Sequence, residues 1–224
     1  MTRITPEVVP PGETAEAPAQ LTAKQRQALA TRTRLLAAAF EEFQQHGLAG
    51  ARVDRIAERA GANKRLIYVY FVDKETLFDT VLEQHLEALI DGVPFAVEDL
   101  PTYAADLFDY LEQRPELLRL FTWRTLERGA DAASSAPELA SYHDKVHAID
   151  AAQRAGAVAG GVPAAHVLAQ ILALAQFWAL AAPALQAVEA VGVARRQLAG
   201  RRRRSVYEAT LRLTRPAAPR GAGQ

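Results

Sequence analysis

Four neighbouring residues combine positive charge with apolar surface: Lys64, Arg65, Leu66 and Tyr68. Lysine and arginine bind phosphates and the O6 and N7 acceptors of guanine, and hydrocarbon packs against the methyl group of thymine. These residue types therefore suit the major groove of duplex DNA. A solvated helix face carries the same residue types, so the surrounding sequence must decide between the two interpretations.

Two short helices are the elements that must position these side chains. Apolar residues recur at helical spacing over residues 53–60, Gly61 tolerates the left-handed backbone that ends a helix, and Asn63 can cap the next helix. In that second helix Ile67 and Phe71 lie one turn apart and predict its buried side, which leaves Arg65 and Val69 farthest from the core. Two helices joined by a glycine-containing turn form a helix-turn-helix.

Residues Arg32 to Leu86 resemble the DNA-binding domain of TetR-family transcriptional regulators, and the resemblance covers about a quarter of the chain. It rests on Phe43-Gln44-Gln45-His46-Gly47, Ile56-Ala57, Ala60-Gly61, Ile67-Tyr68-Val69-Tyr70-Phe71 and Asp73-Lys74-Glu75-Thr76-Leu77. The resemblance implies an all-α homodimer that binds a near-palindromic operator, usually as a repressor. It also implies that a small molecule in the C-terminal domain causes release.

The resemblance implies the roles of individual residues. It places Lys64, Arg65, Leu66 and Tyr68 against base edges and matches Lys74 to a lysine that contacts phosphate. Val69 stands where the family commonly has a second aromatic residue or a histidine. Tyr68 and Tyr70 are therefore left to supply hydroxyl groups near phosphate. Tyr70 is expected to be half core, with its hydroxyl available.

Arg52 stands where the relatives usually have Thr or Ser, directly before the helix that starts at Val53. Arginine cannot accept hydrogen bonds from the free amides of a first helical turn. A DNA phosphate could satisfy those amides with Arg52 beside it, or water could do so at a cost of about 1 kcal/mol.

The charge of the chain is divided unevenly although it sums to zero. Residues 24–74 hold ten cations and five anions, an excess of five positive charges, whereas residues 75–224 have a net charge of −3. The positive field therefore coincides with the helix-turn-helix. Among the cations, Arg26, Arg32 and Arg34 either contact phosphate or lie on a solvated helix end.

Cysteine is absent from the sequence, which excludes disulfides, thiolate nucleophiles and Cys-based zinc sites. The N-terminus lacks the apolar stretch of a signal peptide, so a cytoplasmic protein is expected. Neither a nucleophile elbow nor a phosphate-binding glycine loop occurs, and no cofactor or metal is predicted. His143 and His147 share a helix face, but two histidines alone are a weak metal signal.

Proline, glycine and apolar periodicity divide the chain into four parts. We predict a disordered tail at 1–22, a helix-turn-helix DNA-binding domain at 23–73, a helical effector-binding and dimerisation domain at 74–215, and a second tail at 216–224. The first helix should end at Gly47. Later helices are expected over 74–90, 101–113, 115–129, 137–156, 164–182 and 193–214.

The helix at 164–182 is apolar nearly all round, so it must be covered on more than one side. A membrane span is the lesser alternative, because the segment is rich in alanine and lacks flanking aromatic and basic belts. The resemblance implies that this helix and the last one pack with their counterparts in a second chain as a four-helix bundle. Arg201–Arg204 should form a solvated face with salt bridges rather than a second nucleic-acid contact.

An effector pocket, implied by the resemblance, should lie among the four helices between residues 101 and 182. Aromatic side chains there could line it or simply fill the core: Tyr103, Phe108, Tyr110, Phe121, Trp123, His147, Phe177 and Trp178. An apolar or aromatic effector is the natural expectation. The sequence thus favours a dimeric ligand-responsive regulator over its two rivals, a helical adaptor without DNA binding and a small helical enzyme.

Overall fold

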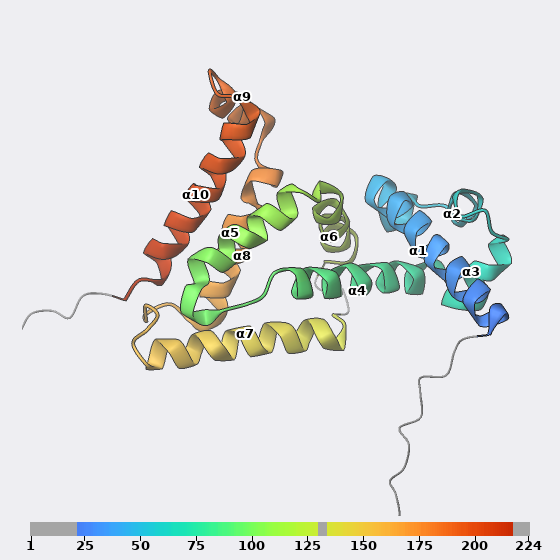
Figure 1. Cartoon of the computed structure of the whole chain (residues 1–224), viewed down its shortest axis with the longest axis horizontal. Coiled ribbons are helices and arrows are strands. Elements are labelled where there is room, and N and C mark those ends of the chain that lie inside the picture. Colours follow the sequence, from blue (N-terminus) through green and yellow to red (C-terminus); the bar gives the residue numbers. More distant parts are fainter. Residues whose placement is uncertain (1–21, 130–133, 217–224) are drawn as a thin grey trace, which may run out of the picture.

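The computed structural model describes residues 22–129 and 134–216 of the chain, and these residues form helices and no strands (Figure 1). The predicted tails lie outside these ranges except for Thr22 and Pro216. The elements are α1 (Ala23–Gly50), α2 (Val53–Arg59), α3 (Lys64–Phe71), α4 (Lys74–Gly92), the 3₁₀ turn η1 (Val97–Asp99), α5 (Leu100–Glu112), α6 (Pro115–Arg128), α7 (Ala136–Arg154), α8 (Ala164–Leu180), α9 (Pro183–Ala190) and α10 (Arg195–Thr214).

The first four helices share a small core. Phe43 of α1 and Phe78 of α4 meet edge to face with ring centroids 4.9 Å apart, and Ile56, Ile67 and Phe71 complete the contact with α2 and α3. Each of these side chains is almost fully buried. The predicted N-terminal helix-turn-helix domain is confirmed in its helical architecture.

A second core joins α5, α7, α8 and α10. Leu107 and Phe108 of α5, Ile149 of α7, Ile171 of α8 and Val206 of α10 are buried in it. The fourth helix runs from the small core to the large one: its first half is buried among α1–α3, and Leu89 near its end packs on the second core. Figure 1 shows α4 as the link between the two groups of helices.

One boundary matches the sequence prediction and one helix was not predicted. The first helix is broken at Gly47, whose φ of 66° and ψ of −175° are not helical, as predicted, and one further helical turn follows to Gly50. The short helix α9 was not predicted from the sequence. Pro183 occupies its first turn, a position proline favours, but no residue of α9 is buried, so it has no core-facing stripe to detect.

No single helix in the described ranges is long and apolar enough to cross a membrane. Only α8 and α9 taken together pass that test, and they are bent by 80° relative to each other.

Candidate nucleic-acid interface and effector cavity

The exposed face of α3 carries the cationic and apolar side chains that the sequence placed there. The Asn63 side chain caps the helix by accepting a hydrogen bond from the Arg65 amide at 2.8 Å. Ile67 and Phe71 are buried, which turns Arg65, Tyr68 and Val69 to solvent. Tyr68 is 48% exposed and Val69 is 64% exposed, so this face offers apolar surface beside its charge.

One of the predicted contact residues, Leu66, is less available than expected, because it is half-buried against the small core. Tyr70 is half-buried against the same core, as its sequence position predicted. Two exposed apolar residues were left out of the predicted set, Val69 and Val72. Val72 follows α3 with a φ of 66°, which is unusual for a β-branched residue.

Lys64 forms an ion pair with Asp54 of α2, with Nζ and Oδ1 2.8 Å apart. This hydrogen bond raises the pKa of Lys64 above its ordinary value. Both side chains are exposed, so a DNA phosphate has to compete with Asp54 for the ammonium group.

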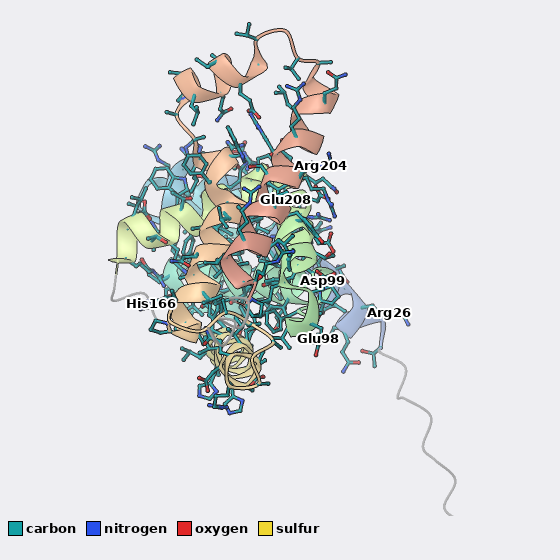
Figure 2. All side chains as sticks on the ribbon, turned by 90° about the vertical axis from the view of Figure 1, so that its left-hand side faces the viewer. Arg26, Glu98, Asp99, His166, Arg204 and Glu208 are labelled. Atoms are coloured by element: carbon teal, nitrogen blue, oxygen red, sulfur yellow. The ribbon has the colours of Figure 1, made fainter. Side chains whose placement is uncertain are left out.

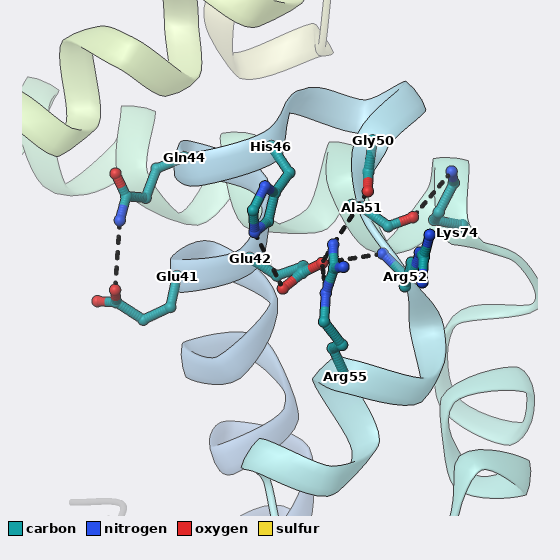
Figure 3. A network of polar contacts seen from close by, with 9 residues as sticks. All are labelled: Glu41, Glu42, Gln44, His46, Gly50, Ala51, Arg52, Arg55 and Lys74. Carbon is teal, nitrogen blue, oxygen red and sulfur yellow. Dashed lines mark hydrogen bonds and ion pairs between the residues drawn. The ribbon is translucent and has the colours of Figure 1, made fainter.

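Arg52 precedes α2 without any side-chain cap, as its chemistry predicts. Its own amide instead donates a hydrogen bond to Glu42 Oε1 at 3.0 Å (Figure 3). The Arg52 side chain is exposed. The amides of the first turn of α2 therefore remain available to a phosphate or to water.

Glu42 connects α1 to α2 from a fully buried position. Arg55 Nε donates to Glu42 Oε1 at 2.7 Å, and Arg55 Nη2 donates to the Gly50 carbonyl at 3.1 Å (Figure 3). Burial alone would raise the pKa of Glu42, but the bonds from Arg55 and from the Arg52 amide outweigh it and lower that pKa. The carboxylate thus stays ionised and fixes α2 against α1.

Lys74 lies at the first turn of α4 and turns toward the end of α1. Its Nζ donates hydrogen bonds to the carbonyls of Leu48 at 2.7 Å and Ala51 at 3.3 Å. The predicted phosphate contact of Lys74 stays a prediction. In the free protein this ammonium holds α4 to the segment that leads into α2.

Helix α6 also holds the segment that leads from α1 into α2. The Glu127 carboxylate accepts hydrogen bonds from the amides of Leu48 at 2.7 Å and Ala49 at 3.2 Å. Trp123 lies so close to Gly47 that a Cβ there would approach its ring to 2.9 Å. Residues 47–51 are therefore positioned by both α4 and α6.

A cavity of about 200 Å³ lies among α4, α5, α6, α7 and α8. Its apolar lining includes Leu86, Leu89, Leu107, Phe121 and Leu172, and its polar lining is Tyr103, Arg124, Thr125, Glu138, Ser141, Tyr142, Lys145 and Gln176. Burial raises the pKa of Tyr103 to about 12. This phenol is therefore a neutral hydrogen-bond donor at any physiological pH.

Only two of the predicted pocket residues, Tyr103 and Phe121, line this cavity. Phe108 is buried in the second core, and Trp123 packs against Gly47. The remaining residues of the prediction lie elsewhere: His147 and Phe177 are exposed, Trp178 lies under the Arg202 guanidinium, and Tyr110 lies under that of Arg114. Aromatic type alone could not separate these places, because rings fill cores, cavities and surfaces alike.

The arginine run of α10 forms intramolecular ion pairs, as predicted. Arg202 pairs with Glu189 of α9 at 2.7 Å and stacks on Trp178, and Arg203 pairs with Asp106 and Asp109 of α5 at 2.8 and 2.7 Å. His143 and His147 are both exposed on α7, and no group of three metal-ligand side chains occurs in the described ranges.

Helix α8 lies beside α10 (Figure 2), and its exposed side carries small and apolar residues together with His166 and Gln170. Alanines at 169 and 173 are exposed, and Phe177 and Leu180 follow at 50% and 58% exposure. Exposed Leu185, Val188 and Val191 continue the apolar surface through α9 and the residue after it. Exposed apolar residues of this kind are typical of a contact with another chain.

Two family models match this chain. The model described as bacterial regulatory proteins, tetR family, matches residues 35–81, and the model described as tetracyclin repressor-like, C-terminal domain, matches residues 99–212. The HTH-type transcriptional repressor SCO4008 of Streptomyces coelicolor is 39% identical over 160 residues, which are 71% of this chain and 83% of that protein. The HTH-type transcriptional regulator RutR of Escherichia coli O157:H7 is 28% identical over 173 residues, 74% and 81% of the two chains.

A solved structure extends the similarity to the arrangement of helices. The transcriptional regulator SCO4942 from Streptomyces coelicolor is 37% identical and superposes with a TM-score of 0.72. The alignment covers 84% of this chain and 99% of that one.

Proposed function

Because this chain belongs to the TetR family of bacterial transcriptional regulators, we propose that it binds a near-palindromic operator as a homodimer and releases it when a small molecule occupies the cavity. Membership makes it a DNA-binding regulator rather than an enzyme. Repression is the direction of regulation we infer, since SCO4008 is named as a repressor. Its operator lies in the bacterial cytoplasm, and we expect the protein there.

The exposed face of α3 is the observation that carries this proposal. Arg65, Tyr68 and Val69 project from a helix whose opposite side is locked into the small core by Ile67 and Phe71. Such a helix can enter a major groove without rearrangement of the protein, with Arg65 bonded to guanine and Val69 against a thymine methyl group.

Homodimerisation is supported by the exposed apolar surface of α8 and α9. Two recognition helices must contact successive major grooves about 34 Å apart, so the contact between subunits sets the spacing on which operator binding depends. A dimer that buries this surface would remove Phe177 and Leu180 from water.

Ligand response is supported by the route from the cavity to the reading helices. Arg124 and Thr125 of α6 line the cavity, and Glu127 in the next turn bonds to the amides of Leu48 and Ala49 just before α2. A ligand that shifts the end of α6 would therefore move the segment that positions α2. The ligand changes operator affinity only if it binds the DNA-binding conformation and the released conformation with different affinity.

Selection of binding sites from random duplex DNA by the purified protein tests this function. We expect enrichment of an inverted repeat with half-sites one helical turn apart, and an affinity that falls steeply with salt. A protein that is monomeric in solution, or that enriches no duplex at low ionic strength, would overturn the proposal.

A further inference from the structure

Helix α7 presents a polar stripe to the interior where an apolar one is expected. Glu138, Ser141, Tyr142 and Lys145 line the cavity at the spacing i, i+3, i+4 and i+7, which is that of the buried face of a helix. Across the cavity, α4 contributes Leu86, Leu89 and Ile90. The cavity therefore has one polar wall and one apolar wall.

Only one charge on this wall lacks an ion-pair partner in the described part of the chain. Arg124 binds both oxygens of Glu138, at 2.9 and 2.7 Å, so that pair is neutral and already satisfied. Lys145 Nζ donates to Ser141 Oγ at 2.5 Å and has no carboxylate within ion-pair distance. Burial lowers the pKa of Lys145, which expresses the cost of a half-buried ammonium, and the charge of neighbouring Asp144 offsets that cost only in part.

We propose that the effector is a small amphipathic anion whose carboxylate or equivalent acidic group binds Lys145 and whose apolar body packs against α4 and α5. The inference rests on the proposed function and specifies its ligand class. A carboxylate at this place forms a charge-assisted hydrogen bond with Lys145, with Ser141 and Tyr142 as neighbouring donors. Inside the cavity, a cationic head group would meet one lining carboxylate, Glu138, which is already paired with Arg124.

The size of the cavity limits the size of the ligand. At about 200 Å³ it lies below the roughly 300–1,000 Å³ that is typical of drug-sized ligands, so the ligand is compact. The acids Glu87, Asp91 and Asp144 line a more open cleft next to it, on whose rim Lys145 also lies. The acidic group of the ligand must therefore reach past these carboxylates to the ammonium, which a compact molecule with a terminal acid can do.

Three probes with one body and different head groups test the inference: 3-phenylpropanoate, 3-phenylpropan-1-ol and 3-phenylpropylamine. Binding to the full-length protein without DNA is measured by titration calorimetry. We expect the acid to bind about tenfold more tightly than the alcohol, equivalent to 1.4 kcal/mol, and the amine to bind most weakly. Equal affinities, a preference for the amine, or no binding of the acid would overturn the inference.

Two variants of Lys145 test whether this residue causes the preference for the acid. Lys145→Met keeps the aliphatic stem and should reduce the preference for the acid to less than about threefold, whereas Lys145→Arg should keep it. Arg119→Met, which removes an exposed cation of α6 outside the cavity, is the matched control and should behave as the native chain. An unchanged preference in Lys145→Met would contradict the assignment, and should that variant not fold, the head-group series on the native chain still decides.

Operator binding without ligand distinguishes the two proposals. If the native chain binds its selected operator but does not prefer the acid, only the ligand class is wrong. If it binds no operator, the proposed function fails whatever the probes do.

Discussion

Single side chains decide whether the face of α3 can contact DNA. Arg65 supplies the donors for a base edge, and Tyr68 combines an apolar ring with a hydroxyl that can reach a phosphate. Asp54 opposes this function in the free protein, because it pairs with Lys64 on the same surface. The surface therefore carries less free positive charge than its sequence suggests.

Replacement of both contact residues in Arg65→Ala/Tyr68→Ala should abolish specific operator binding and leave the dimer intact. Each contact is worth roughly 1–3 kcal/mol, and neither side chain supports the core. Footprinting measures the binding, and light scattering measures the mass. Arg119→Ala is the control, and a retained footprint in the double variant would refute the role of α3.

Glu42→Gln should lower the free energy of unfolding at pH 7 by about 1–3 kcal/mol, because it leaves the Arg55 guanidinium without its charged acceptor. The folded-state pKa of Glu42 lies below the unfolded value of 4.5, so its contribution is present above that pH and is lost as pH falls through the folded pKa. The difference between variant and native chain should thus shrink in acid. Urea unfolding at several pH values measures it, with neighbouring Glu41→Gln as the exposed control.

At the scale of elements, the segment from Gly47 to Ala51 is the junction between the two groups of helices. Lys74 of α4 binds its carbonyls and Glu127 of α6 binds its amides, so two of the helices that border the cavity also hold the start of α2. Arg128 adds an ion pair to Asp79 of α4 at 2.5 Å, which ties α6 to α4 directly.

Gly47→Ala should destabilise the protein more than Gly61→Ala. Both glycines have positive φ, 66° and 57°, so both substitutions strain the backbone by at least about 1–2 kcal/mol, and the ψ of −175° at Gly47 lies in a region that essentially only glycine adopts. Only at Gly47 does a Cβ collide with α6, at 2.4 Å from Glu127 Oε1 and 2.9 Å from Trp123, whereas nothing lies within 4 Å at Gly61. Thermal unfolding of the two variants should show an additional cost of roughly 1–3 kcal/mol at Gly47, and equal losses would contradict this tight contact.

At the scale of the whole molecule, the spacing of two reading helices depends on a surface that one chain leaves exposed. The buried side of α8 belongs to the second core through Val167, Leu168 and Ile171, while Phe177 and Leu180 face water. Helix α10, which carries exposed Arg201 and Arg204, packs against α8, so an apolar contact with a charged border is expected for the dimer.

Phe177→Glu should weaken dimerisation by at least about tenfold, because it buries a carboxylate in the proposed contact. Operator affinity should fall with it, since a monomer places only one recognition helix. Analytical ultracentrifugation measures the dissociation constant. Leu139→Glu, at a 59% exposed position of α7, is the control, and an unaltered dimer in Phe177→Glu would exclude α8 from the contact.

The sequence by itself determined the helical architecture, the helix-turn-helix and its outward face. These depend on local spacing and capping: Asn63 caps α3 as expected, and Ile67 and Phe71 are buried one turn apart. Tertiary structure alone decided which aromatic residues reach the cavity, that Lys74 turns toward α1, and that α7 lines the cavity with polar groups. Those outcomes depend on contacts between helices distant in sequence, and the periodicity of one helix shows which side is buried but not what it is buried against.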